Sequence, residues 1–335
     1  MDFTPEPAQQ AVADVVNSAL ERENSWAALV SGGVLGLGVP ERLGGDGVGL
    51  PELATALTEI GRHGLVSPAV ATLGFGVIPL LETAAEVQQD RYLEGVGKGS
   101  VLTAALNEPG AALPELPVTR LTDGRLNGVK VAVAHAAQAD WMLVSTDSGI
   151  AVVSPRAEGV RLTATPTSAG GEEFAVEFSG APVDAVLEGA EVHRLNQLAV
   201  AAVGAYAAGL VAGAVRLTAD YVANRHQFGR PLSTFQTVAA QLAEVYIAAR
   251  TLSLASASVI WRLAEGRDAD EDIDVMAFWL TSNAPPAMQT CHHLHGGMGM
   301  DITYPMHRYY SSIKDVTRLL GGPAHRLDLV GAQCT

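Results

Sequence analysis

Two short stretches of the chain carry side chains that could hold an extended dianion. The first runs from Arg225 to Gln236 and contains Arg-His-Gln-Phe-Gly-Arg-Pro, and the second runs from His293 to Gly299 and reads His-Leu-His-Gly-Gly-Met-Gly. Arginine forks pair with phosphate oxygens, and glycines let a ligand approach backbone N–H groups that a Cβ would shield. Both stretches therefore point to a pyrophosphate-containing ligand, such as a nucleotide cofactor.

The segment that follows the second stretch lacks an acid–base group. Leu319-Leu320-Gly321-Gly322-Pro323 contains no carboxylate. The sequence thus predicts a chain that holds a nucleotide cofactor but lacks the base that would use it.

The histidines beside Cys291 raise the possibility of a metal site. His292, His293 and His295 are close in sequence, but consecutive helical residues point in different directions, and no Cys or His pair has zinc spacing. We expect no metal. Two cysteines, Cys291 and Cys334, do not make a disulfide framework, which is typical of a reducing compartment.

The elements that must position these stretches fall into three segments. Residues 1–98 show helical spacing of apolar residues, and residues 99–188 show short β-type runs with turns between them. Residues 189–335 are helical again, over 191–224, 234–265, 272–295 and 303–320. We expect an α+β fold that is mostly α: an N-terminal helical domain, a small middle antiparallel β-barrel or sandwich, and a C-terminal four-helix bundle. The Pro285-Pro286 pair is expected to kink or break the third long helix.

Composition excludes some partners. The net charge of −15 argues against nucleic acid, because phosphate backbones select a basic face. The run from Leu198 to Val215 has eighteen residues without a charge, but it is mostly Ala, Gly and Val and leads into a charged helix, which favours a buried bundle helix over a membrane span. The start, Met1 to Pro7, is acidic and contains two prolines, unlike a secretory signal. We expect a cytoplasmic protein.

Several motifs together resemble those of the acyl-CoA dehydrogenase family. Arg225 to Gly229 with Phe235-Gln236 is similar to the family's R-x-Q-F-G…F-Q signature, and His295 to Gly299 with Tyr304-Pro305 is similar to its GGxG…YP signature. Pro40 to Gly45 and Leu106 to Pro109 extend the resemblance over nearly the whole chain. The ending of the chain further resembles the smaller subunit of actinobacterial heteromeric dehydrogenases that act on cholesterol side-chain CoA thioesters.

The resemblance implies an FAD-dependent α,β-desaturation of an acyl-CoA substrate, in which a Glu removes the α-proton. The three positions where family members carry that Glu align with Leu320, His193 and Arg250. None is a carboxylate, and a guanidinium cannot act as a base near neutral pH. Glu244, on the same predicted helix as Arg250, is the remaining candidate for a relocated base.

The predicted β-domain also departs from the family pattern. Asn107 to Leu113 keeps Glu-Pro but loses the later polar residues that contact the flavin ring, and Ala134 stands where a Thr or Ser is usual. In this family the pyrophosphate motifs reach across to a neighbouring subunit's FAD. The resemblance therefore implies an FAD whose ring and catalytic Glu belong to a partner chain, with an α2β2 heterotetramer and an electron-transfer flavoprotein as acceptor. The residues implied to contact that FAD are Arg225, Phe228, Gln236, His293, Gly296, Gly297 and Gly299.

Two other hypotheses stay open. The chain could be a self-sufficient homomeric dehydrogenase that uses a displaced base such as Glu244, or a structural or regulatory protein that binds no cofactor.

Overall fold

The structure is a computed structural model and describes residues 4–333. By internal packing the described chain divides into two units: unit 1 holds Thr4, residues 58–66 and residues from 204 on, and unit 2 holds residues 5–57 and 67–203. Helices α3 (Leu50–Arg62) and α6 (Val192–Asn224) each contribute residues to both units. The domain boundaries 1–98, 99–188 and 189–335 follow chain order instead, and they stay a prediction.

Unit 2 begins with short helices. Their bounds are α1 Pro7–Arg22, α2 Trp26–Ser31, the π-helical turn η3 Val70–Val77, α4 Ile78–Thr83 and α5 Glu86–Leu93, with 3₁₀ turns η1 Val34–Gly36, η2 Glu41–Leu43 and η4 Val96–Lys98. The helical spacing of apolar residues expected in residues 1–98 is confirmed here, and Ser25 starts a helix of its own after α1: its Oγ accepts the Ala28 N–H at 3.1 Å.

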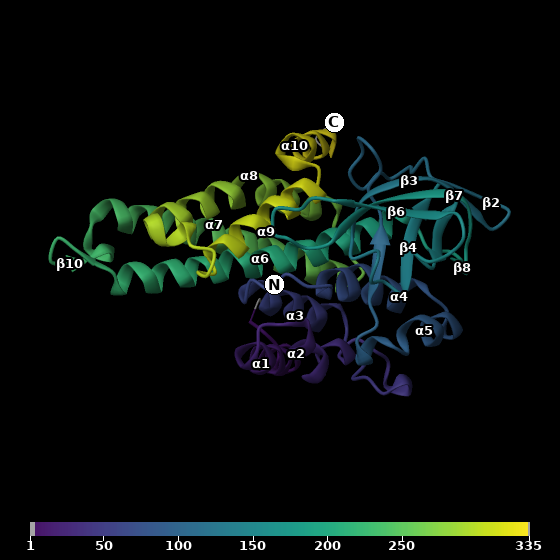
Figure 1. Ribbon diagram of the computed structural model, residues 1–335, viewed down its shortest axis with the longest axis horizontal. Helices are drawn as coiled ribbons and strands as arrows, with labels where there is room; N and C mark the ends of the chain where they lie inside the picture. The colour runs from purple at the N-terminus through teal and green to yellow at the C-terminus, as the bar shows by residue number, and fades with distance from the viewer. Residues whose placement is uncertain (1–3, 334–335) are drawn as a thin grey trace. The chain divides into compact units, whose positions relative to one another are not determined.

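Two four-stranded sheets follow (Figure 1). Their strands are β1 Leu102–Ala105, β2 Arg120–Thr122, β3 Arg125–Ala134, β4 Trp141–Thr146, β5 Gly149–Val153, β6 Val160–Thr165, β7 Glu173–Pro182 and β8 Ala185–Leu187. The first sheet has the order β1-β4-β5-β8 and the second β2-β3-β7-β6. One buried cluster takes residues from both, including Met142 and Val153 of the first and Leu126 and Phe178 of the second.

The expectation of a wholly antiparallel β-domain is wrong at one strand. Strand β1 pairs with β4 in parallel, Leu102 opposite Trp141 and Ala105 opposite Val144, whereas the other pairings in these two sheets are antiparallel. Parallel neighbours need a long connection between them, and residues 106–140, which contain β2 and β3, supply it.

Unit 1 is the helical bundle (Figure 1). Its elements after α6 are the hairpin strands β9 His226–Gln227 and β10 Arg230–Pro231, η5 Leu232–Thr234, α7 Gln236–Ala264, α8 Asp270–His295, η6 Gly296–Met300, α9 Met306–Leu319 and α10 Gly322–Gln333. Helix α8 packs against α7, α9 and α10. The pair Pro285-Pro286 lies inside α8 and does not break it, so the expected break is wrong, whereas the alternative of a kink stays a prediction. The contacts with those three neighbours stabilise the continuous helix.

The small residues of α6 have a packing reason. A Cβ at Gly209 would lie 1.9 Å from the Thr58 carbonyl oxygen, and one at Gly61 would lie 2.1 Å from the Tyr206 carbonyl oxygen. The backbones of α3 and α6 therefore touch within unit 1, which only glycine allows. Two helices, α6 and α7, are long and apolar enough to span a membrane by length and composition, but the apolar window of α6 is 89% buried, as in a bundle core helix.

Candidate cofactor site

A pocket lies where α8 ends and α9 begins, in unit 1. Its volume is about 560 Å³. The residues that line it are Gln289, His292, His293, Gly296, Gly299, Met300, His307 and Tyr310. Three residues predicted from the sequence, His293, Gly296 and Gly299, thus meet in one cavity. The lining offers imidazole and amide groups but no carboxylate, so an anion meets no like charge from these side chains.

The glycine turn, which carries Gly296, Gly297 and Gly299, forms one wall of the pocket, and glycine has a different reason at each position. Gly296 has φ +55° and ψ −135°, a conformation that L side chains rarely adopt. A Cβ at Gly299 would lie 2.8 Å from Cδ2 of His292 and 3.0 Å from its carbonyl oxygen, so this glycine is needed for packing. At Gly297 a Cβ would meet no described atom within 4 Å. The chain itself gives no reason for glycine at 297, which leaves room there for a ligand against the backbone.

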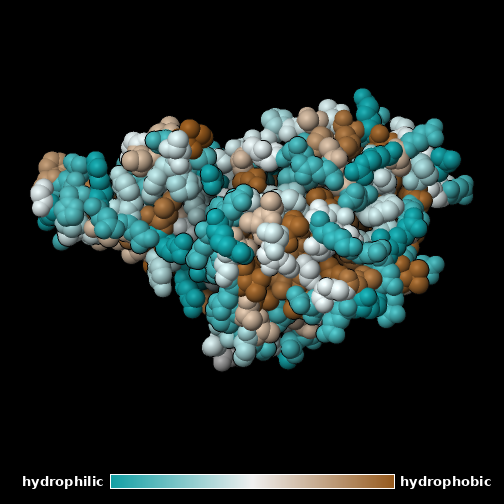
Figure 2. All heavy atoms as spheres, turned by 60° about the horizontal axis from the view of Figure 1, so that its bottom comes forward, coloured by the Kyte–Doolittle hydropathy of each residue, from teal (hydrophilic) through white to brown (hydrophobic). Residues whose placement is uncertain are grey.

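The other four predicted residues do not line the pocket. Gly297 lies in the glycine turn, and Arg225, Phe228 and Gln236 lie on and beside the β9–β10 hairpin. Phe228 and Gly229 form its turn with φ +52° and +78°, and the Phe228 side chain is 92% exposed. Positive φ is uncommon for a non-glycine residue, and a fully exposed phenylalanine gains nothing from burial. On the face shown in Figure 2, the end of this unit that carries the hairpin, at the left, is mostly hydrophilic.

The flanks of the hairpin are fixed by backbone contacts. The N–H of Arg225 donates to the Tyr221 carbonyl oxygen at 2.8 Å, and the Arg225 carbonyl oxygen accepts from Leu232 N at 2.8 Å. The Arg225 side chain is exposed, and none of the ion pairs found among residues 4–333 includes it. Gln236 begins α7 and is also exposed. Arg225 and Gln236 therefore present a guanidinium and an amide to solvent from a rigid frame.

The three positions aligned with the family's base lie in different surroundings. Leu320 is 1% exposed, and its carbonyl oxygen accepts from Arg326 Nε at 2.8 Å. Arg250 and Glu244 are exposed on α7. His193, in unit 2, is half-exposed, and its Nδ1 lies 3.0 Å from a Glu115 carboxylate oxygen. The structure thus places a carboxylate beside one of these positions, which the sequence did not indicate.

Glu115 belongs to a loop that is tied to α6 within unit 2. Asn196 Nδ2 donates to the carbonyl oxygens of Leu113 and Pro114 at 3.1 and 3.3 Å. Leu113 has φ +45°, and its N–H donates to Asn107 Oδ1 at 2.9 Å. The loop around Leu113 is therefore tied in place by two of the chain's own side-chain amides.

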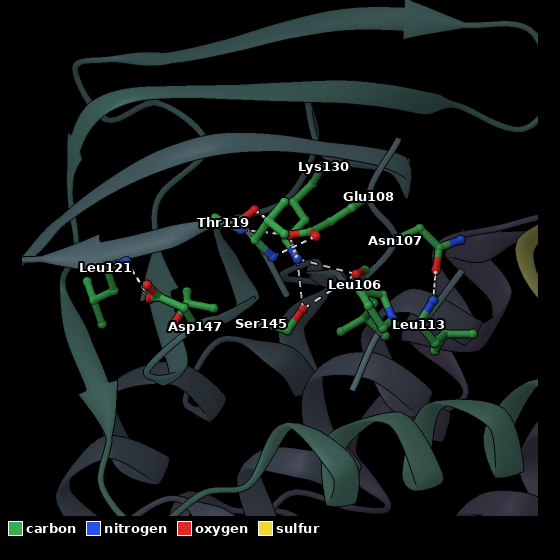
Figure 3. Close-up of polar contacts among 12 residues, drawn as sticks. Leu106, Asn107, Glu108, Leu113, Thr119, Leu121, Lys130, Ser145 and Asp147 are labelled. Atoms are coloured by element: carbon green, nitrogen blue, oxygen red, sulfur yellow. Dashed lines mark hydrogen bonds and ion pairs between the residues drawn. The ribbon is translucent and has the colours of Figure 1, made fainter. Parts of the chain in front are cut away.

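Glu108, the carboxylate kept from the family's β-domain pattern, is used inside the chain (Figure 3). It is buried and lies 2.9 Å from Nζ of Lys130, which has no exposed surface. Its oxygens also accept from Val118 N, Thr119 N and Thr119 Oγ1 at 2.7 to 2.9 Å. Lys130 donates in addition to Ser145 Oγ at 2.9 Å and to the Leu106 carbonyl oxygen at 3.3 Å.

The charges of this pair follow from those contacts. Burial by itself raises the pKa of Glu108, but the hydrogen bonds from Val118, Thr119 and Lys130 together lower it to about 2. Burial lowers the pKa of Lys130 to about 8, against the opposing effect of Glu108. Both groups are therefore charged at neutral pH, and the pair stabilises the β-domain rather than facing a ligand. Ala134 offers only its carbonyl oxygen, which accepts from Thr103 Oγ1 at 2.6 Å.

Five residues of the pocket were missed in the sequence: Gln289, His292, Met300, His307 and Tyr310. A signal for one of them was present, because Gln289 lies four residues before His293, a spacing that puts the two side chains on one helix face. Among the described residues no group of three or more His, Cys, Asp or Glu is placed to hold a metal ion. Cys291 is a free, buried thiol whose pKa is raised by burial to about 11, and Cys334 lies outside the described residues.

Comparison with known proteins identifies the class. Residues 2–100 match the model of the acyl-CoA dehydrogenase N-terminal domain, and residues 191–332 match that of the acyl-CoA dehydrogenase C-terminal domain. The chain belongs to the acyl-CoA dehydrogenase family, an FAD-binding family of oxidoreductases, which confirms the expected family, fold and cofactor.

Three similar proteins narrow the class further. The chain is 67% identical to the acyl-CoA dehydrogenase FadE28 of Mycobacterium tuberculosis, over 100% of this chain and 99% of that one. It superposes with a TM-score of 0.90 and 30% identity on a chain of the ChsE4-ChsE5 complex from Mycobacterium tuberculosis, covering 100% and 99% of the two chains. On a chain of the Tcur3481-Tcur3483 steroid acyl-CoA dehydrogenase, a G363A variant, it superposes with a TM-score of 0.87 and 28% identity. That match covers 97% of this chain and 96% of the other. The ChsE4-ChsE5 and Tcur3481-Tcur3483 structures are both heteromeric complexes.

Proposed function

We propose that this chain is a non-self-sufficient subunit of a heteromeric FAD-dependent acyl-CoA dehydrogenase that desaturates a bulky, steroid-derived acyl-CoA between its α and β carbons. The observation that carries the proposal is a contrast within the chain. A Cβ at Gly297 would meet no described atom within 4 Å, and the pocket lined by its neighbour Gly296 has no carboxylate in its lining. Leu320, at one of the positions of the base, is by contrast a buried aliphatic residue.

The groups that this chain offers indicate which part of FAD it would contact. In the reaction a base takes the α-proton of the thioester, and FAD, when bound, accepts the hydride from the β-carbon. We infer that Arg225 pairs with the pyrophosphate, that Gly297 presents its backbone N–H, and that His293 donates a hydrogen bond in place of a family glutamine. The exposed Phe228 ring packs on the adenosine. Gln236, Gly296 and Gly299 complete the contacts.

The partner subunit is inferred to supply what this chain lacks. Glu108 pairs with Lys130, and Asn196 holds the loop around Leu113 by a hydrogen bond to its carbonyl oxygen, so we assign the flavin ring and the catalytic Glu to a partner. One FAD per heterodimer follows, and two in an α2β2 heterotetramer. The heteromeric solved relatives, one a steroid acyl-CoA dehydrogenase, support a partner of the same family. An electron-transfer flavoprotein remains the expected acceptor, and a cytoplasmic location remains expected.

The test compares this chain alone with the chain co-expressed with a candidate partner dehydrogenase. Alone, we expect colourless, inactive protein; together, a yellow complex that desaturates a steroid acyl-CoA and holds half a flavin per chain. Gly297→Ala is the sharpest variant, because its Cβ meets nothing in the chain within 4 Å and therefore leaves the packing of the chain itself unchanged. We expect at least a tenfold loss of FAD affinity with an unchanged Tm. Gly331→Ala, also free of contacts within 4 Å, is the matched control and should keep full affinity.

A second candidate is favoured by one observation, the Glu115 carboxylate 3.0 Å from His193. In a self-sufficient homomeric dehydrogenase, Glu115 or Glu244 would be the relocated base. A yellow, active homo-oligomer that is inactivated by Glu115→Gln or Glu244→Gln would establish this and refute the heteromeric proposal. A purely structural role would show as unchanged flavin content in the complex after Arg225→Ala.

A further inference from the structure

Three aromatic rings from three elements meet at one end of the helical bundle. Tyr221 lies in the last turn of α6, His295 is the last residue of α8, and Tyr304 precedes α9. The rings of Tyr221 and His295 are stacked, with centroids 4.6 Å apart and an interplanar angle of 28°. The ring centroid of Tyr304 lies 5.2 Å from that of His295 and 6.3 Å from that of Tyr221. His295 is 1% exposed, so its ring is enclosed by this stack and its neighbours.

Each ring is joined through the backbone to a residue of the candidate cofactor site. The Tyr221 carbonyl oxygen accepts from Arg225 N at 2.8 Å. His295 directly precedes Gly296, which begins the glycine turn. The Tyr304 carbonyl oxygen lies 2.7 Å from Nδ1 of His307, a residue of the pocket wall. The hairpin, the glycine turn and the start of α9 therefore share one buried contact.

The ring of His295 is also fixed to its own helix. Its Nδ1 lies 2.8 Å from the Cys291 carbonyl oxygen, one turn earlier in α8. Burial lowers the pKa of His295, the Cys291 carbonyl raises it and nearby His292 lowers it again, with a net fall. The imidazole is therefore neutral at pH 7, and it acts in the stack as an aromatic ring rather than as a cation.

We propose that the stack of Tyr221, His295 and Tyr304 is a positioning device that holds the Arg225 segment and the Gly296–Gly299 turn in the relative geometry that a dinucleotide diphosphate requires. The inference rests on the proposed function. A ligand that spans two segments is bound tightly only when their separation is already correct, because any reordering on binding lowers affinity. The three rings touch no ligand themselves and act through the residues that follow them.

The experiment uses the complex with the partner dehydrogenase, freed of flavin and titrated with FAD while flavin fluorescence is followed. His295→Ala removes the ring, and we expect FAD affinity to fall at least tenfold. His295→Phe keeps a ring of similar size without the imidazole nitrogens, and it should restore affinity to within threefold of the unmodified complex. Tyr304→Ala, at a half-buried position, is a milder variant in case His295→Ala does not fold; we expect a loss of about fivefold.

A matched control separates positioning from general stability. Leu280 is fully buried on the same helix α8 and is not part of the stack. Leu280→Ala should lower Tm at least as much as His295→Ala yet keep FAD affinity within threefold. The inference is overturned if His295→Ala and Tyr304→Ala keep full affinity, if Phe does not rescue, or if Leu280→Ala loses as much affinity as His295→Ala.

Arg225→Ala distinguishes failure of this inference from failure of the proposed function. If Arg225→Ala leaves FAD affinity unchanged, the proposed function fails and the positioning role fails with it. If Arg225→Ala weakens FAD binding while the His295 variants do not, the proposed function stands and only the positioning role is wrong.

Discussion

Replacing Lys130 by Met tests whether the buried ion pair holds the β-domain together. Lys130 has no exposed surface, and its Nζ contacts Glu108, Ser145 and the Leu106 carbonyl oxygen within 3.3 Å. Met has a similar volume, so the variant removes the charge and three hydrogen bonds without leaving a large cavity. The loss should therefore report the polar contacts rather than packing.

The expected loss of stability depends on the Glu108 carboxylate, which stays buried after Lys130 is replaced. Breaking a buried ion pair by removing one partner costs about 3 to 5 kcal/mol, because the other charge stays buried without compensation. Here Glu108 keeps the N–H groups of Val118 and Thr119 and the Thr119 hydroxyl as donors, so it stays ionised and partly satisfied. We therefore expect the lower end, a loss of about 3 kcal/mol in the free energy of unfolding at pH 7.

Urea unfolding of the purified chain, followed by tryptophan fluorescence, measures this loss, and Trp141 on β4 is a probe within the same unit. The control is Arg161→Met on β6, whose guanidinium pairs with Glu177 at an exposed position. An exposed pair contributes about 0.5 kcal/mol or less. If Lys130→Met costs no more than Arg161→Met, the reasoning about burial is refuted.

Three further outcomes are expected. The pKa of Glu108 is lowered from 4.5 to about 2, so its contribution to stability is complete above pH 4.5 and is lost as the pH falls toward 2. Urea unfolding at a series of acidic pH values should show the free energy of unfolding fall by about 3 kcal/mol over this range. A free energy of unfolding that does not change with pH there would contradict the prediction. Gly299→Ala should lower both Tm and FAD affinity, unlike a contact-free glycine, since its Cβ meets His292 at 2.8 Å. Asn196→Ala should speed proteolysis near Leu113 at least fivefold, while the free energy of unfolding changes by only about 1 kcal/mol. Equal cleavage rates in the variant and the unmodified chain would show that the Asn196 hydrogen bonds do not hold the loop.

The bundle was readable from the sequence because its signals are local. The Ala-rich run within α6 and the spacing along α7 predict helices whatever their neighbours are. Helix α10 is not among the helices that the sequence predicts, which end at residue 320, just before Gly321-Gly322-Pro323. Both glycines have positive φ; Gly321 follows the end of α9, whereas Gly322 begins α10, and a proline in the first turn suits a new helix. The parallel pairing of β1 with β4 was not predicted because it joins segments that are about forty residues apart.

The candidate site divides in the same way. Motif spacing located His293, Gly296 and Gly299, which the structure brings into one pocket. It could not find His307, because that residue reaches the pocket only through the turn between α8 and α9. Nor could it show that Glu115 lies beside His193, seventy-eight residues away, since no local pattern links them. The assigned cofactor contacts remain a proposal that the variants above test.

The two departures from a self-sufficient dehydrogenase are independent of each other, and this independence favours a partnered role. Leu320 stands at one position of the base in unit 1, while in unit 2 Asn196 ties the loop around Leu113 and Glu108 pairs with Lys130. Either one alone would impair catalysis within a single chain. A protein that had lost cofactor binding altogether would have no reason to keep Phe228 exposed at positive φ, or glycine at the unobstructed position 297. We infer that the residues this chain retains face a nucleotide that is seated in another subunit.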